Sequence, residues 1–199
     1  AMGADGELIV RLSRIGAGLP AAQAGICIRD SLEADAACVA VTVNSAGNVL
    51  FQHRSARGAA AVLRQSLPGR GAPQWLRLVR CGSFFSAYVS GDLEDWIWLG
   101  TQMISMREEV HAGLTLWSGS NPQSATAVFE SLTVSNRLLQ DREPPAAPTL
   151  SILESTASGV CVSVGNARDD MGVAGFQLFR DGVRIATLPA WKGTYLDST

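Results

Sequence analysis

Carboxylates are the side chains in this sequence best suited to acid–base chemistry, and they gather in turns. Asp92, Glu94 and Asp95 lie close together, and residues 108–109 form a second acidic turn. A retaining glycosidase needs two carboxyl groups about 5 Å apart, which alternate positions of one strand can supply. The segments where such a pair would be needed carry none, and Glu130 is alone on its segment. We therefore predict no catalytic residues and no enzyme activity.

The same acidic turn is the best candidate for a metal site. Asp92, Glu94 and Asp95 could offer the oxygen ligands that calcium prefers. The sequence lacks the dense aspartate loop of a dedicated calcium site, and solvated turn charges are the alternative interpretation. Asp169 and Asp170 precede a later strand-like segment, where aspartate usually stabilises a turn. We predict no metal and no cofactor, with calcium at the acidic turn as the alternative.

Histidine and cysteine give no sign of a reactive site. His53 and His111 lie far apart in the sequence, and each is interpreted as a packing or hydrogen-bonding residue at a strand end. The four cysteines lack metal-ligand spacing and are predicted to be free thiols that serve as small hydrophobic residues. A disulfide from Cys38 to Cys27 or Cys81 stays open as an alternative. Signatures of serine hydrolases, zinc proteases and phosphate loops are absent from the sequence.

Aromatic residues point instead to carbohydrate binding, because flat rings pack against the apolar faces of sugars. Trp117 ends a strand-like segment and runs into the polar stretch 118–123, which contains Asn121. We predict that Trp117 and Asn121 contact a ligand at the rim of the domain, with rim packing as the alternative. Trp98 and Tyr88 are further candidates. The remaining aromatic candidates are Trp75, Trp96 and Trp191.

Arginines on strand-like segments form a second candidate surface. Arg29, Arg54, Arg77 and Arg80 would form a basic groove for acidic glycans if they shared one face, and Arg54 is retained as a candidate binding residue. The alternative is that they stack on aromatic rings or pair with acids.

The composition of the chain limits which classes of protein it can belong to. The chain has 199 residues, of which 47% are hydrophobic and 17% charged, with a net charge of −2. No basic patch indicates nucleic acid. The longest apolar run, residues 36–43, is shorter than the roughly 20 residues that span a bilayer. We predict no nucleic-acid partner and no membrane insertion.

Short alternating segments separated by turn residues predict an all-β antiparallel sandwich. Residues 73–92 read as a β-hairpin, Asn44–Asn48 as a turn between two strands, and residues 57–71 as a loop. The strands of the first domain are expected near residues 7–14, 25–29, 38–44, 49–54, 75–80, 84–90, 96–101, 110–117 and 127–134.

A proline-rich stretch divides the chain. We assign residues 1–4 to a cloning remnant, 5–140 to the first domain, 141–148 to the linker and 149–199 to a second domain. Strands are expected there near residues 149–153, 160–164, 175–180 and 184–188, with a hairpin turn at Asp181-Gly182.

Residues 5–135 resemble a bacterial concanavalin A-like lectin/glucanase module. The resemblance is carried by residues 24–32, 51–54, 73–90, 96–100, 112–114 and 129–134. It implies a jelly-roll sandwich. The chain departs from the pattern at the acidic turn 92–95, at its cysteines and in lacking the first strands ahead of Asp5. The resemblance also leads us to expect a core role for Trp75 and Trp96, and a small residue where Trp117 stands.

Residues 145–199 resemble the first part of a bacterial fibronectin type III module. The resemblance rests on Pro145 and Pro148 and on residues 160–164, 167–182 and 195–197. A complete module of this kind has about 100 residues, so an incomplete fibronectin/immunoglobulin-like sandwich is expected, with an open core that could drive self-association.

The resemblances lead to one functional hypothesis and two alternatives. We expect a non-catalytic accessory region of a larger exported bacterial protein, extracellular or at the cell surface, that binds a polysaccharide or another glycan. A structural or adhesive protein-interaction module without a sugar site is the first alternative, and a degenerate glycoside hydrolase is the second. The inference rests on fold-level likeness.

Overall fold

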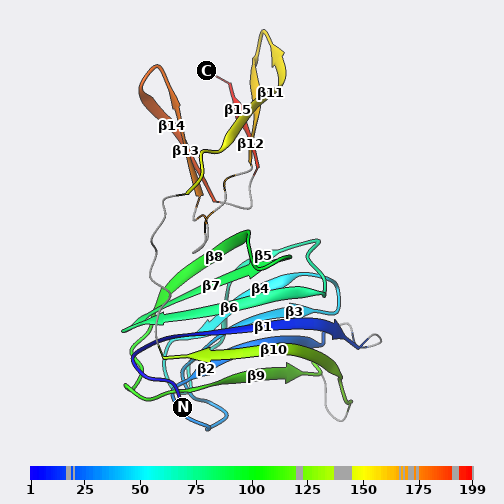
Figure 1. The fold of residues 1–199 in the computed structure, drawn as a ribbon, viewed down its shortest axis with the longest axis vertical. Coiled ribbons are helices and arrows are strands. Elements are labelled where there is room, and N and C mark those ends of the chain that lie inside the picture. The colour runs from blue at the N-terminus through cyan, green and yellow to red at the C-terminus, as the bar shows by residue number, and fades with distance from the viewer. Residues whose placement is uncertain are drawn as a thin grey trace. The chain divides into compact units, whose positions relative to one another are not determined.

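The computed structural model describes residues 1–16, 19, 21–119, 123–136, 145–165, 167, 169, 173, 175–189 and 193–198. In this part of the chain every regular element is a strand, from β1 to β15 (Figure 1). It contains no helix long and apolar enough to cross a membrane. The predicted all-β antiparallel fold is confirmed. Two compact units are present, Ala1–Leu93 with Leu99–Gln140, and Glu94–Trp98 with Asp141–Thr199.

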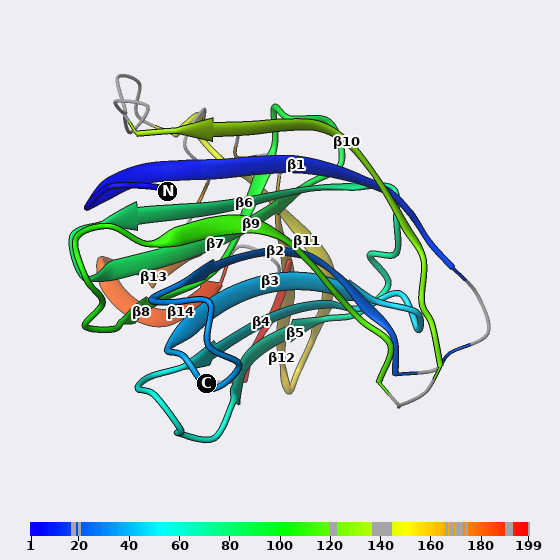
Figure 2. The same cartoon turned by 90° about the horizontal axis from the view of Figure 1, so that it is seen from below.

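The first unit is a sandwich of two antiparallel sheets, and Figure 2 shows the two layers. The first sheet has the strand order β10-β1-β6-β7-β8. Its strands are β1 (Asp5–Ile15), β6 (Gln74–Cys81), β7 (Phe84–Ser90), β8 (Trp96–Met103) and β10 (Ala127–Ser135). The second sheet has the order β5-β4-β3-β2-β9. Its strands are β2 (Gln23–Arg29), β3 (Cys38–Asn44), β4 (Val49–Arg54), β5 (Val62–Leu67) and β9 (His111–Trp117).

The core lies between these sheets and is built by alternation along each strand. In β2, Ala24, Ile26 and Ile28 are fully buried, and the valines of β3 lie opposite them. In the first sheet Leu8 of β1 pairs with Leu78 of β6, and both are fully buried. Burial of each such side chain contributes about 1.5–3 kcal/mol, so the alternation decides which face of each strand is turned inward.

Turn chemistry closes the hairpins as predicted. At the β3–β4 turn, Gly47 has φ 80°, and the Asn48 amide donates to Asn44 Oδ1 at 2.8 Å. In the second unit, Asp181 and Gly182 have φ 51° and 80°, the left-handed values that a two-residue hairpin turn requires. Both predicted turns are confirmed.

The sequence-based reading of residues 57–71 as a loop is wrong over β5. Residues Val62–Leu67 pair with β4 as an edge strand. The first five of them are largely exposed, so the segment lacks the alternation of burial that marks a strand in sequence. Residues 1–4 pack on the first unit, where Met2 is buried and its amide donates to the Val110 carbonyl at 2.9 Å.

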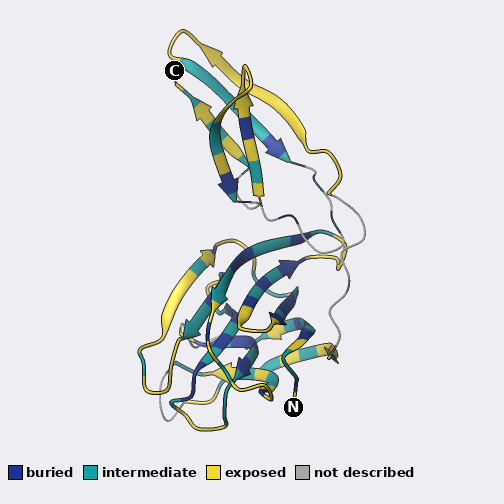
Figure 3. Cartoon of the chain, turned by 90° about the vertical axis from the view of Figure 1, so that its left-hand side faces the viewer, coloured by how far each residue is buried: buried dark blue, intermediate teal, exposed yellow. Residues whose placement is uncertain are grey.

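The second unit has a much smaller core. Strands β11 (Thr149–Thr156), β12 (Gly159–Gly165) and β15 (Thr194–Asp197) form one sheet, and β13 (Gly175–Arg180) and β14 (Val183–Pro189) form a hairpin. Buried core residues of this unit are Val164, Leu178 and Leu188. Strand β11 is exposed along its whole length, as the yellow colour in Figure 3 shows.

An ion pair is buried on the first sheet. Arg77 is 1% exposed and Glu7 is 3% exposed, and the Arg77 Nε donates to Glu7 Oε2 at 2.9 Å. Removing one partner of a buried pair leaves an uncompensated charge, which costs far more than losing an exposed pair.

We predict that Arg77→Met lowers the free energy of unfolding by about 3 kcal/mol or more, and that Glu7→Gln in the same background recovers part of the loss. Chemical denaturation measures both. Arg57→Met, which removes the exposed pair with Asp35, is the control and should cost less than about 1 kcal/mol. Equal losses in Arg77→Met and Arg57→Met would contradict the assignment.

Candidate functional site

Polar side chains of the second sheet lie on its outward face. Since the buried residues of β2 and β3 alternate, their neighbours point away from the core. Strand register arranges the outward residues in four rows across the sheet. The rows are Trp117, Gln23, Asn44; then Thr115, Gly25, Thr42, Leu50; then Gly113, Cys27, Ala40, Gln52; then His111, Arg29, Cys38, Arg54.

Three polar side chains from three strands form a connected network on this face. Gln52 Nε2 donates to Gln23 Oε1 at 2.7 Å and to Thr42 Oγ1 at 3.2 Å. Thr42 Oγ1 in turn donates to Gln23 Oε1 at 3.1 Å. Thr42 is only 4% exposed, so it serves as the link that holds the two half-buried amides in place. Such mutual hydrogen bonds fix side-chain orientation before any ligand arrives.

Trp117 stands at the end of the same line. It lies directly opposite Gln23 in the β2–β9 register, and its side chain is 57% exposed. An exposed tryptophan beside oriented amides combines an apolar surface with hydrogen-bonding groups, which is the combination that sugar recognition requires.

Small residues lie between these groups. A Cβ atom on Gly25 would lie 2.1 Å from the Val41 carbonyl oxygen and 2.7 Å from the Thr42 Cα, so only glycine fits there. Gly113 has open space where a side chain would be, and Ala40 lies beyond Gly25 on the same face. The β3 backbone fills the place of a Gly25 side chain, and Gly25 is itself buried, so the open position on this part of the face is the one at Gly113.

The fourth row differs, because its arginines hold a loop. Arg54 Nη1 donates to the Ala34 carbonyl at 2.8 Å, and Arg29 Nη2 donates to the Glu33 carbonyl at 2.5 Å. Cys27 and Cys38 are free thiols. The pKa of Cys27 is raised, mainly because the thiol is buried. The guanidinium groups of this row are thus engaged with the 30–37 segment.

The other two candidate arginines lie in the first sheet. Arg77 pairs with Glu7, and Arg80 donates to the carbonyls of Gly3, Arg107 and Glu108. The four arginines are not brought onto one face, so the basic groove that the sequence suggested is not formed.

The remaining sequence candidates lie apart from Trp117. Tyr88 is on β7 of the first sheet, with its ring 5.4 Å from the Arg77 guanidinium carbon, and Trp98 is half-buried on β8 of that sheet. Asn121 lies outside the described residues. Of the predicted binding residues, Trp117 and Arg54 share the outward face, at its opposite ends.

The acidic turn is organised by a serine. The Ser90 hydroxyl donates to Asp92 Oδ1 at 3.0 Å and accepts from the amides of Asp92 and Leu93. Within the described part of the chain, no three His, Cys, Asp or Glu side chains lie close enough together to hold a metal ion.

Gln23, Thr42 and Gln52 were not singled out from the sequence. Thr42 and Gln52 lie in the predicted strands 38–44 and 49–54, whereas Gln23 precedes the predicted strand 25–29 and belongs to β2 in the structure. Alternation alone marks Thr42 and Gln52 as outward-facing residues. Their meeting depends on the pairing of β2, β3 and β4.

Of the comparisons with known proteins, the one with solved structures found similar folds. No protein-family model matches the chain, and no curated protein matches it. Among solved structures, the GH43 protein BlXynB from Bacillus licheniformis has a TM-score of 0.55 and 15% identity, over 67% of this chain and 28% of that chain. A functionally unknown protein from Saccharomyces cerevisiae has a TM-score of 0.53 and 16% identity, over 69% and 72%.

The carbohydrate-binding module CBM66 from Bacillus subtilis has a TM-score of 0.49 and 19% identity, over 68% of this chain and 77% of that chain. The chain thus spans little more than a quarter of the length of BlXynB. At these identities the likeness to BlXynB and to the yeast protein establishes a β-sandwich fold and nothing about a ligand.

His53 lies at the edge of the core and not at the candidate site. Its Nδ1 is buried without a hydrogen-bond partner, and burial, assisted by Arg64, lowers its pKa below the ordinary value of 6.5. The unfolded chain therefore binds this proton more readily than the folded chain.

We predict that the contribution of neutral His53 to the free energy of unfolding is fully present above pH 6.5. This contribution declines as the pH falls below that value, until folded His53 also titrates. Thermal unfolding between about pH 7.5 and about pH 5.5 measures the decline. His53→Leu should flatten it and His111→Gln should leave it unchanged. An equal decline in His53→Leu would show that another group is responsible.

Proposed function

We propose that the first unit is a non-catalytic carbohydrate-binding module and that its site is the outward face of the second sheet. The observation that carries the proposal is the line formed by exposed Trp117 and the Gln23–Thr42–Gln52 network. An aromatic ring can stack on a sugar while oriented amides bond its hydroxyl groups.

The described carboxylates support a binding role over catalysis. The four rows of the outward face contain no aspartate or glutamate. Glu130 pairs with Arg11 at 2.5 Å, and Glu7 is buried against Arg77. Glycoside hydrolysis needs two carboxyl groups that converge on one bond, and the four described rows of the outward face supply none. The likeness to BlXynB is one of fold.

The wider setting of the module is also a proposal. We propose that the chain is an accessory region of an exported bacterial protein, acting outside the cell, and that the second unit is a partial fibronectin type III-like spacer. Support for the spacer is its separate core and its division into the β11–β12–β15 sheet and the β13–β14 hairpin.

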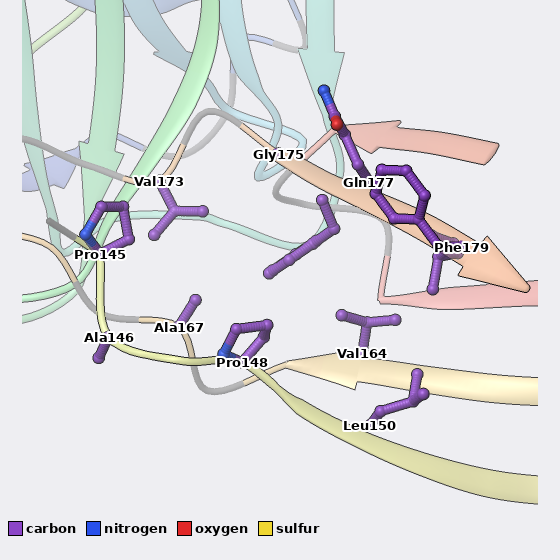
Figure 4. A pocket seen from close by; sticks show the side chains of 12 residues that line it. Pro145, Ala146, Pro148, Leu150, Val164, Ala167, Val173, Gly175, Gln177 and Phe179 are labelled. Atoms are coloured by element: carbon purple, nitrogen blue, oxygen red, sulfur yellow. The ribbon is translucent and has the colours of Figure 1, made fainter. Parts of the chain in front are cut away.

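Self-association through the second unit is a second candidate function, favoured by one observation. A cavity of about 580 Å³ opens between the β13 hairpin and the β11–β12 side of the unit (Figure 4). Its lining is uncharged and mostly apolar, and includes Pro148, Leu150, Val164 and Phe179. A second copy of the chain, bearing the same apolar surface, is the partner we propose.

Replacing the exposed tryptophan tests the carbohydrate-binding proposal. We predict that the chain binds at least one soluble polysaccharide and that Trp117→Ala weakens this binding at least tenfold, because one stacked aromatic anchor typically contributes more than about 1.4 kcal/mol. Affinity electrophoresis on a polysaccharide panel, with and without calcium, measures it. Phe84→Ala removes a ring that is 53% exposed in the first sheet and is the matched control. Equal weakening in both variants would contradict the assignment.

Sedimentation velocity tests the second candidate. We predict concentration-dependent dimers that Phe179→Ser abolishes, because it removes an exposed apolar ring from the cavity mouth. Leu32→Ser, on the first unit, is the control for loss of an exposed apolar side chain. A monomer at all concentrations would overturn self-association and leave the sugar site untouched.

A further inference from the structure

The outward face also indicates which class of carbohydrate it fits. We propose that it recognises an uncharged glycan chain through adjacent hydroxyl groups. Gln23 donates a hydrogen bond to one hydroxyl group, and Gln52 accepts a hydrogen bond from its neighbour. This inference rests on the proposed carbohydrate-binding function and adds the chemistry of the ligand.

The hydrogen bonds within the network leave two groups available to a ligand. Gln23 Oε1 accepts from both Thr42 and Gln52, and the Gln52 amide nitrogen donates to both of its partners. The groups that remain are the Gln23 Nε2, which can donate, and the Gln52 Oε1, which can accept. A pair of neighbouring hydroxyl groups offers the complementary acceptor and donor, because each hydroxyl can do both.

The distribution of charge on the face favours a neutral ligand over an ionic one. The first three rows of the outward face, from Trp117 to Gln52, carry no charged side chain. The arginines of the fourth row donate to the Ala34 and Glu33 carbonyls. A carboxylated or sulfated sugar bound over these three rows would find no side chain there to form an ion pair, so its binding is disfavoured relative to that of a neutral sugar.

The length of the line favours a chain over a single sugar. Trp117, Gln23, Thr42 and Gln52 lie on four consecutive strands, β9, β2, β3 and β4. Neighbouring strands are about 4.8 Å apart, so the line extends about 14 Å across the sheet. Over that distance the open position at Gly113 and the small side chain of Ala40 leave room for a flat, extended ligand.

Gln23→Glu is the sharpest test, because it changes one group. A glutamate at this position keeps an oxygen that accepts from Thr42 and Gln52, so the network is retained. It replaces the outward N–H donor with a charged acceptor. We expect at least a tenfold loss of affinity for a neutral polymer, since a donor is removed and a charge is placed against the ligand. Gln102→Glu, on β8 of the first sheet, is the matched control, and thermal unfolding checks that both variants fold.

The probes are neutral polymers (β-glucan, xylan, mannan and levan) and acidic polymers (alginate, polygalacturonate and hyaluronan). Binding is measured at about 20 mM and about 500 mM NaCl, a range over which exposed charge interactions are strongly screened. We expect a neutral polymer to bind with an affinity that changes less than about threefold with salt, and Gln102→Glu to bind as the parent chain does.

The outcomes separate the two proposals. Binding of acidic polymers alone, lost at high salt, would overturn the uncharged-ligand inference and leave carbohydrate binding in place. Neutral binding that is weakened by Trp117→Ala but not by Gln23→Glu would overturn the roles of the two glutamines. Absence of binding to every polymer would overturn both proposals.

Discussion

The register of the second sheet is the constraint on which the candidate site depends. A strand has a period of two, so a slip of one residue would turn every side chain to the opposite face. Ala24, Ile26 and Ile28 are fully buried on one face of β2, which forbids such a slip because it would expose all three. The core thereby holds Gln23 and Gly25 outward. Thus the hydrophobic effect, acting on one side of the sheet, orders the polar network on the other.

Close packing of two strands adds to this constraint at Gly25. The Val41 carbonyl oxygen and the Thr42 Cα approach so near that no Cβ fits between them. The absence of a side chain lets β2 and β3 pack closely beside Thr42. One residue therefore links the packing of the sheet to the position of the polar network.

The fold could be predicted from the sequence further than the site could. Alternation of apolar residues located most strands, and Asn44–Asn48 and Asp181-Gly182 located two turns, because these signals are local. Strand β5 was missed because an exposed edge strand carries little alternation. Trp117 was found because a large ring at a strand end is visible in the sequence. Gln23 and Gln52 were not, since 29 positions separate them and only strand pairing brings them together.

The structural roles of the arginines explain why these residues were misleading as indicators of the ligand. In a chain with few charged residues, Arg77 is matched by Glu7 inside the protein, and Arg80 and Arg54 donate to backbone carbonyls. A guanidinium with several donors suits such structural roles, because it can satisfy more than one carbonyl of a loop at once. These three arginines are therefore engaged within the fold, and the line from Trp117 to Gln52 stays uncharged. The character of the surface follows from where the fold needs its charges as much as from which residues lie on the face.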